Sequence, residues 1–226
     1  MENLSQIKLV LNRIYVYLFV ERFNKKIKFD FPKDIYRWDL VKFLIKKYNF
    51  KSYLEIGCDK DQLFNKIDID IKIGVDPISG GNIRDSSDNF FKKSNQKFDI
   101  IFIDGLHHYD QVSKDIKNSL SVLNEKGIIL VHDCLPQTKA HQSVPRYRGT
   151  WNGDVWKSIV EFRTKENLDI FVCMIDFGIG VIKKRKNQDL LKLNKTNFKK
   201  LKFKDYYYNH KKFMNIKSYD ETLRII

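Results

Sequence analysis

The stretch from residue 98 to residue 136 constrains the fold more than any other part of the chain. One apolar run in it ends in Asp104-Gly105, and a second ends in His132-Asp133. Between the two runs, apolar residues recur at helical spacing, which predicts a strand–helix–strand unit with polar residues at both strand ends. Ligands of an open parallel sheet bind just outside the carboxyl ends of its strands. We therefore expect these polar residues to share one rim of a sheet and to form part of a site.

The rest of the chain continues the alternation of strands and helices. Strands are expected at 52–57 and 71–76, and as a hairpin at 169–175 and 178–182; helices are expected at 4–23, 35–48 and 155–163. This order predicts an α/β fold, a Rossmann-like doubly wound sheet with helices on both faces. We divide the chain into a helical N-terminal appendage (1–50), a central domain (51–184) and a basic, aromatic C-terminal appendage (185–226).

Composition narrows the class of partner. A net charge of +14 is compatible with binding to a nucleic acid or an anionic membrane. The lysines are spread through the chain, however, so we attribute the charge to a solvated surface. Three widely spaced cysteines without a C-x-x-C pattern predict neither a disulfide framework nor a cysteine zinc site, and we expect a reducing cytoplasm.

The N-terminal helix expected at 4–23 has an apolar segment at 14–20, far short of the roughly 20 residues that a membrane span needs. We expect no transmembrane segment. The helix is compatible with packing on the domain's own edge, with a lid, with a homo-oligomer contact and with peripheral contact to a membrane.

The turn after the first strand argues against a dinucleotide. A pyrophosphate needs G-x-G-x-x-G, whereas residues 57–61 hold one glycine and two carboxylates. A cofactor with a cationic centre, an amine and a ribose fits better, and S-adenosylmethionine has all three. Asp76 would then meet the ribose hydroxyls; the methionine part would lie beside Glu55 and Gly57, and the adenine would face Asp85 and Ser86. Asp104, at the same rim, is a further candidate for cofactor binding.

Five stretches of the sequence resemble those of a known enzyme family: YLEIGCDKD, KIGVDPISGG, FDIIFIDGLHHYDQVSKDIKNSL, GIILVHDCLP and WNGDVWKSIVEFR. From about residue 51 to 183 the chain resembles the class I S-adenosylmethionine-dependent methyltransferases. It is most similar to the branch with sugar and natural-product O-methyltransferases, some of whose relatives are named cephalosporin hydroxylases. The resemblance implies seven strands with the last antiparallel. The chain departs from it in the glycine-poor turn and in Asp104-Gly105-Leu106 and His132-Asp133, where metal-dependent relatives carry D-G-D and a D-D or E-D pair.

Methyl transfer needs a positioned acceptor and a base. His107 and His108, beside Asp104, are candidate bases because an imidazole pKa near 6.5 suits the task. Adjacent residues point in different directions, and we favour His107; the alternative is that both lie at a helix cap or on the surface. Asp104, His132 and Asp133 are a candidate site for a divalent metal such as Mg²⁺ or Mn²⁺, the imidazole favouring Mn²⁺. Alternatively, the two acids bind loop amides or the substrate.

Trp151, Asn152 and Asp154 suggest a substrate platform with an aromatic face and hydrogen-bonding groups suited to a sugar; alternatively, Trp151 is core and Asp154 a helix cap. Together these features predict O-methylation of a sugar or another small polyhydroxylated acceptor, in glycan or natural-product biosynthesis. Two alternatives stay open. One is a nucleic-acid methyltransferase, although IDGLHHY stands where an N/D-P-P-Y motif would; the other is a non-catalytic, membrane-surface member of the fold.

Overall fold

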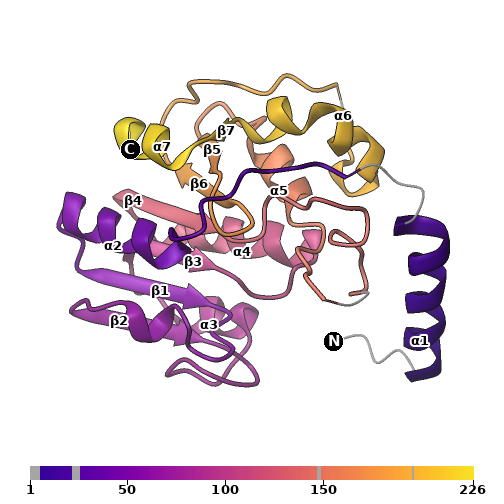
Figure 1. The fold of residues 1–226 in the computed structure, drawn as a ribbon. Helices are drawn as coiled ribbons and strands as arrows, with labels where there is room; N and C mark the ends of the chain where they lie inside the picture. Colours follow the sequence, from indigo (N-terminus) through magenta and orange to yellow (C-terminus); the bar gives the residue numbers. More distant parts are fainter. Residues whose placement is uncertain (1–5, 22–25, 147–148, 195) are drawn as a thin grey trace.

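The computed structural model describes residues 6–21, 26–146, 149–194 and 196–226. A seven-stranded sheet forms its centre, in the order β2-β1-β3-β4-β6-β5-β7 (Figure 1). The strands are β1 (Ser52–Ile56), β2 (Ile71–Val75), β3 (Phe98–Ile103), β4 (Leu123–Val131), β5 (Asp169–Cys173), β6 (Ile179–Lys183) and β7 (Ile216–Lys217). Only β6 among these runs antiparallel to its neighbours, β4 and β5. The predicted seven-stranded, doubly wound sheet with one antiparallel strand is confirmed.

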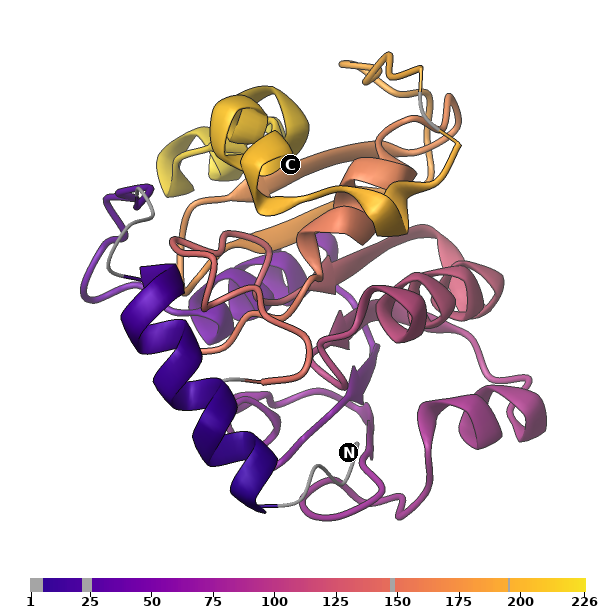
Figure 2. The same cartoon turned by 90° about the vertical axis from the view of Figure 1, so that its right-hand side faces the viewer.

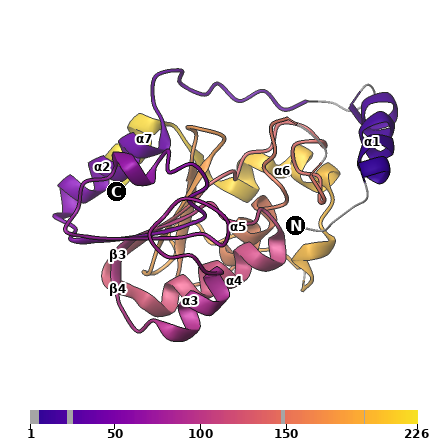
Figure 3. The same ribbon diagram turned by 90° about the horizontal axis from the view of Figure 1, so that it is seen from below.

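Helices cover both faces of this sheet, and Figure 3 shows α2 and α7 on one side and α3 and α4 on the other. The reason is the period of two along each strand. Ile100 and Phe102 of β3 pack with the core beneath α2, while Ile101 and Ile103 pack with the core beneath α4. The helices are α2 (Arg37–Tyr48), α3 (Ser87–Lys93), α4 (Tyr109–Val122), α5 (Trp156–Phe162), α6 (Phe203–Met214) and α7 (Tyr219–Ile225).

The seventh strand differs from the sequence-based expectation. The antiparallel strand β6 is the last strand of the central domain, but the seventh strand, β7, comes from the C-terminal appendage. After β2, Ile83 forms a single bridge with Val75. Between β1 and β2 the chain forms only the short 3-10 helix η2 (Phe64–Lys66). Asp59 and Asp61 adopt positive φ there, which no right-handed helix accommodates.

The C-terminal appendage, residues 185–226, packs on the central domain. After the 3-10 helix η3 (Phe198–Lys200), α6 contributes four side chains to the core shared with α4 and α5: Phe203, Tyr206, Phe213 and Met214. At the other terminus, α1 (Gln6–Tyr15) continues into the π-helix η1 (Val16–Glu21) and stands beside the body (Figures 1 and 2). In the part of the chain that the structure describes, no helix has the length and apolar character needed to cross a bilayer.

Candidate active site

A cavity of about 370 Å³ opens beside the carboxyl ends of β1, β2 and β3. Ligands of doubly wound folds bind at this edge of the sheet. The described residues that line the cavity include five carboxylates and no lysine, arginine or histidine; the acids are Asp59, Asp76, Asp88, Asp104 and Asp115. In a chain with a net charge of +14, this local concentration of negative charge favours a cationic ligand and disfavours a phosphate.

The turn after β1 forms one wall without the glycines of a dinucleotide-binding loop. Gly57 has a φ of +86°, and a Cβ atom there would lie 2.3 Å from the carbonyl oxygen of Asp104. Asp59 and Asp61 also have positive φ, at 46° and 58°, a region that aspartate enters more readily than most residues. The Asp61 carboxylate accepts a hydrogen bond from the backbone of Gly81 at 2.6 Å. The two acids therefore shape the turn, and Asp59 also faces the cavity.

Asp76, the predicted ribose ligand, is held by four backbone amides. Its Oδ1 accepts hydrogen bonds from Ile78 and Ser79 at 2.7 and 2.9 Å, and its Oδ2 accepts from Cys58 and Asp59 at 3.1 and 3.2 Å. Burial alone would raise the pKa of Asp76, but these hydrogen bonds lower it below its ordinary value. The carboxylate is therefore ionised and fixed in the cavity wall.

Four of the six residues predicted to bind a cofactor line the cavity: Gly57, Asp76, Ser86 and Asp104. Asp85 is not among them. Its carboxylate accepts a hydrogen bond from the backbone of Ser86 at 2.8 Å and pairs with Lys93 at 2.8 Å, so it organises the start of α3.

Glu55 is likewise absent from the described lining of the cavity. Side chains two positions apart on a strand share a face, so Glu55 lies on the same side of β1 as Tyr53. The Tyr53 hydroxyl donates a hydrogen bond to Glu55, and Glu55 is only 2% exposed. Burial raises the pKa of Glu55 to about 8. This acid is therefore protonated at neutral pH.

Gln111 and Asp115 of α4 also line the cavity, and sequence reasoning missed both. The Gln111 amide donates to Asp115 at 3.0 Å and to Asp88 at 3.2 Å. Burial raises the pKa of Asp115 to about 6. The spacing of Gln111 and Asp115 could have indicated that both face the site, because polar residues at i and i+4 at the start of an amphipathic helix share a face.

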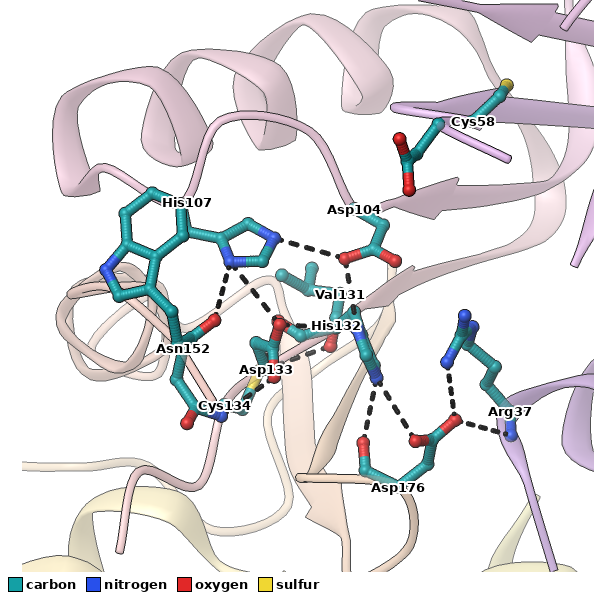
Figure 4. Close-up of polar contacts among 12 residues, drawn as sticks. Arg37, Cys58, Asp104, His107, Val131, His132, Asp133, Cys134, Asn152 and Asp176 are labelled. Atoms are coloured by element: carbon teal, nitrogen blue, oxygen red, sulfur yellow. Dashed lines mark hydrogen bonds and ion pairs between the residues drawn. The ribbon is translucent and has the colours of Figure 1, made fainter. Parts of the chain in front are cut away.

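A histidine cluster, formed by Asp104, His107, His132 and Asp133, adjoins the cavity (Figure 4). Asp104 Oδ1 accepts hydrogen bonds from His107 Nε2 at 3.2 Å and from His132 Nδ1 at 3.0 Å. His107 Nδ1 donates to the carbonyl oxygen of Trp151 at 3.1 Å and lies 3.3 Å from Asp133 Oδ2. Because Asp104 also lines the cavity, it belongs to both parts of the site.

The cluster continues to two residues that the sequence did not indicate. His132 Nε2 donates to the carbonyl oxygen of Asp176 at 2.8 Å, and the Asp176 carboxylate accepts from Arg37 Nη1 at 2.9 Å. Arg37 begins α2 and Asp176 lies in the turn between β5 and β6. The two residues stand 139 positions apart, so no local pattern could have paired them.

Both imidazoles of the cluster are held as cations. A carbonyl oxygen can only accept, so the ring nitrogens that face backbone carbonyls carry protons, and the other nitrogen of each ring faces a carboxylate. Burial alone would lower the pKa of His107 and His132, but Asp104 and Asp133 raise it, for His132 well above its ordinary value. Burial alone would raise the pKa of Asp104; the His132 charge and the His107 hydrogen bond bring it well below the usual range.

The three residues predicted to bind a metal, Asp104, His132 and Asp133, lie beside one another, and His107 adjoins both acids. Ligand atoms of Asp104, His107 and Asp133 lie within 4.8 Å of one another. His132 Nδ1 lies 3.0 Å from Asp104 Oδ1 and 3.5 Å from Asp133 Oδ2, while its Nε2 faces the carbonyl oxygen of Asp176. A set of one imidazole and two carboxylates fits Mn²⁺, Fe²⁺ or Zn²⁺ better than Mg²⁺.

Trp151 and Asn152, predicted to contact substrate, support the cluster. The Trp151 and His107 rings stack with centroids 4.9 Å apart and planes 25° apart, so this indole face is covered. Asn152 is fully buried and donates to Asp133 Oδ1 at 2.8 Å.

The remaining two candidates, Asp154 and His108, lie at the start of α4. Asp154 accepts a hydrogen bond from the backbone of Tyr109 at 2.6 Å and pairs with Lys157 at 3.0 Å, so its carboxylate caps α4 and not α5, the helix that follows it in sequence. His108 occupies the N-cap position of α4 and packs edge-on against Trp151, with centroids 6.0 Å apart. Of the two predicted bases, only His107 lies in the histidine cluster.

Comparison with known proteins gives the same fold. Residues 72–134 match a family described as a methyltransferase domain. The SAH-bound methyltransferase PaMTH1 of Podospora anserina is 16% identical, with a TM-score of 0.50, and the alignment covers 79% of this chain and 88% of that one. The O-methyltransferase of Bacillus cereus in complex with SAH is 10% identical, with a TM-score of 0.51 and coverages of 79% and 90%. The chain has the class I methyltransferase fold. The resemblance to class I methyltransferases is thereby confirmed. No curated protein matches this sequence.

Proposed function

We propose that this chain transfers a methyl group from S-adenosylmethionine to a hydroxyl oxygen of a small polyhydroxylated acceptor such as a sugar. The acidic cavity carries the proposal. The cofactor has a positive sulfonium and a positive α-amino group, has ribose hydroxyls, and has no phosphate. A cavity with five carboxylates and no basic side chain among its described lining residues matches this chemistry.

The lining residues fit the cofactor group by group. Asp76, ionised and held by backbone amides, accepts hydrogen bonds of the kind that ribose hydroxyls donate. Ser86 and Gln111 offer polar atoms to an adenine, and the aliphatic side chains of Ile78 and Leu106 offer apolar surface. Asp104 lies where the cavity meets the histidine cluster, so a positive group bound there is next to the candidate base.

In this proposal His107 is the general base. The bound cofactor supplies an electrophilic methyl group for an in-line displacement by the acceptor oxygen. His107, once neutral, takes the hydroxyl proton at Nε2, the nitrogen that faces Asp104. His132 stays protonated and holds Asp104, while Trp151 holds Nδ1 of His107 through its carbonyl oxygen. Much of the acceleration in such a reaction comes from positioning, and the base adds about 10²–10⁴-fold.

The same residues fit a divalent ion. Asp104, His107 and Asp133 would hold it, and the ion would orient the acceptor hydroxyl and lower its pKa. His107 would then be a ligand and not a base. We favour the base because, among the described residues, three carboxylates of the extended cluster already face three cations: Asp104, Asp133 and Asp176 against His107, His132 and Arg37.

A polyhydroxylated acceptor is supported by the polar character of the rim. Asp104 lines the cavity and contacts His107, which in turn contacts Asp133; both exchange hydrogen bonds with hydroxyls readily. The Trp151 ring stacks on His107, so we infer recognition of the acceptor mainly by hydrogen bonds.

The proposal is tested first by calorimetry with S-adenosylhomocysteine. We expect micromolar binding that does not need a metal. Asp76→Asn should weaken binding about 10–100-fold, because hydrogen bonds to a charged group contribute about 1.5–3 kcal/mol. Asp70→Asn is the matched control, since the Asp70 side chain is 72% exposed and lies outside the described cavity lining, and it should bind like the wild type. Absence of binding by the wild-type protein would refute the proposal.

The acceptor class has its own test. Transfer of labelled methyl from S-adenosylmethionine should be seen with members of a panel of nucleotide sugars and glycans. Labelled product from RNA or DNA, with none from the saccharides, would contradict the proposed acceptor and leave methyl transfer intact.

A further inference from the structure

The loop between β4 and α5 carries positive charge beside the acidic cavity. Residues 134–153 contain Lys139, Arg146 and Arg148 and no acid. Figures 1 and 2 show this loop on the side toward which the parallel strands point, the side that also holds the candidate active site. A loop of this length is usually functional. Its charge favours an anionic ligand, the opposite of what the cavity favours.

Arg146 lies beside Trp151, the residue that stacks on the candidate base. Its guanidinium carbon is 5.7 Å from the centre of the Trp151 ring, and its Nη2 donates a hydrogen bond to the carbonyl oxygen of Gly149 at 2.7 Å. The ring is itself held in place. Its Nε1 donates to the carbonyl oxygen of Ser143 at 2.6 Å, and it stacks on His107 with centroids 4.9 Å apart. Arg146 and His107 are therefore neighbours of the same aromatic ring.

Among the described residues, no acid pairs with Arg146. Its hydrogen bond and its ring contact are with neutral groups, and the residue is exposed. The two acids that flank the loop have other partners, because Asp133 faces His107 and Asp154 pairs with Lys157. A guanidinium presents a planar fork of N–H groups that binds a phosphate or a carboxylate through two hydrogen bonds. Arg146 is thus available to an anionic group of a ligand.

A ligand that reaches both Arg146 and His107 is the acceptor and not the cofactor, because Arg146 is not among the described residues that line the acidic cavity. The guanidinium and the imidazole lie no farther apart than the sum of their distances to the Trp151 ring, a span that one sugar unit with one charged substituent bridges. We propose that the acceptor carries an anionic group, a phosphate or a carboxylate, which Arg146 binds while an acceptor hydroxyl lies at His107. This inference rests on the proposed methyl transfer and adds the charge of the acceptor to it.

The test is calorimetry of the full-length protein loaded with S-adenosylhomocysteine. The ligands titrated are glucose, glucose 6-phosphate, glucuronate and UDP-glucose, so that the phosphate and the carboxylate are distinguished. We expect at least one charged saccharide to bind more than tenfold more tightly than glucose. Arg146→Gln should weaken that binding about 10–100-fold, the effect of one or two hydrogen bonds between charged groups, and should leave the affinity for glucose unchanged.

Arg224→Gln is the matched control. Arg224 is likewise exposed and donates to a backbone carbonyl oxygen, that of Asp220, but it lies on α7 and outside the described cavity lining. This variant should bind all four saccharides like the wild type. Circular dichroism and the unfolding temperature of each variant control for folding.

Absence of binding by all three charged saccharides would overturn the inference, as would equal affinities for them and for glucose. Binding of a charged saccharide that Arg146→Gln leaves unchanged would also overturn it. A loss of affinity for S-adenosylhomocysteine in Arg146→Gln would assign Arg146 to the carboxylate of the cofactor and not to the acceptor. Absence of S-adenosylhomocysteine binding by the wild type would refute the proposed function and this inference with it, so the two failures are distinguishable.

Discussion

His107 is the residue on which the proposed chemistry depends, and its surroundings decide when it can act. One ring nitrogen faces Asp104 and the other faces the Trp151 carbonyl oxygen, so the imidazole is stabilised as a cation. A base must first be neutral. Because the pKa of His107 is raised, methyl transfer should increase with pH through a midpoint above the ordinary histidine value of about 6.5.

Replacing His107 tests its role as the base. His107→Gln should lower kcat by about 10²–10⁴-fold with little change in the affinity for S-adenosylhomocysteine, because the cavity is lined by other residues. The assay is a pH profile of kcat with EDTA present, and the alkaline rise should disappear in the variant. His210→Gln, a change in α6 at a half-buried histidine that does not line the cavity, serves as the control. Activity of the wild type that EDTA abolishes and Mn²⁺ restores would instead assign His107 as a metal ligand.

The same two histidines make stability depend on pH. His107 and His132 have raised pKa values in the folded state, so folding binds protons. Their stabilisation is complete below the unfolded value of about 6.5 and is lost as pH rises through the higher folded values. We expect Tm to fall from neutral to alkaline pH. In Asp104→Asn, which removes the carboxylate shared by both rings, the fall should be smaller; an equal fall would contradict this account.

At the scale of elements, the loop between β4 and α5 positions His107 by close backbone contact. Asp154 N donates to the carbonyl oxygen of His107 at 3.1 Å, and a Cβ atom on Gly153 would lie 1.8 Å from the same oxygen. No side chain fits at this position. The loop and the start of α4 are therefore fixed to each other.

Gly153→Ala tests this contact against a matched glycine. Gly153 and Gly149 have nearly the same φ, 58° and 61°, but nothing lies within 4 Å of a Cβ atom built on Gly149. Both alanine variants incur the strain of positive φ, and only Gly153→Ala adds the clash. Gly153→Ala should be less stable by about 1–3 kcal/mol more than Gly149→Ala in urea unfolding, with a larger loss of activity. Equal stabilities would show that the contact is not tight in solution.

At the scale of the whole molecule, the C-terminal appendage completes the fold. β7 pairs with β5 at the edge of the sheet, and α6 fills part of the core beneath α5. Phe213 is 5% exposed, and Tyr206 and Met214 are fully buried. Residues 203–226 are therefore expected to unfold together with the central domain.

Phe213→Ala tests whether the appendage and the domain unfold as one unit. Removing a buried phenylalanine should lower the free energy of unfolding by about 3–5 kcal/mol in a single transition. Tyr208→Ala on the same helix is the control, because Tyr208 is 66% exposed, and it should have little effect. Two separate transitions, with only the smaller one shifted, would show an independent appendage.

Local patterns were sufficient for strands β1 to β6 and for one side of the site, but β7 was not expected. The apolar runs that end in Asp104 and His132 could be placed at one rim, since parallel strands share their carboxyl edge. The polar ends of β1 and β2, Gly57 and Asp76, followed from the same argument. The position of Glu55 did not follow, because packing decides which face of β1 borders the cavity, and Glu55 lies on the other face with Tyr53. The N-terminal helix was expected from periodicity, but its exposure was not.

The sequence alone determined the order of strands β1 to β6, the acidic turn after β1 and the rim residues, because these depend on spacing along a few residues. Only the tertiary structure decided which side chains meet. It joined Arg37 and Asp176 across 139 positions, brought His107 as well as His132 beside Asp133, and turned Trp151 onto the His107 ring. Such contacts depend on the path of the chain between distant segments, and hydrogen-bond partners at a distance leave no periodic trace in the sequence.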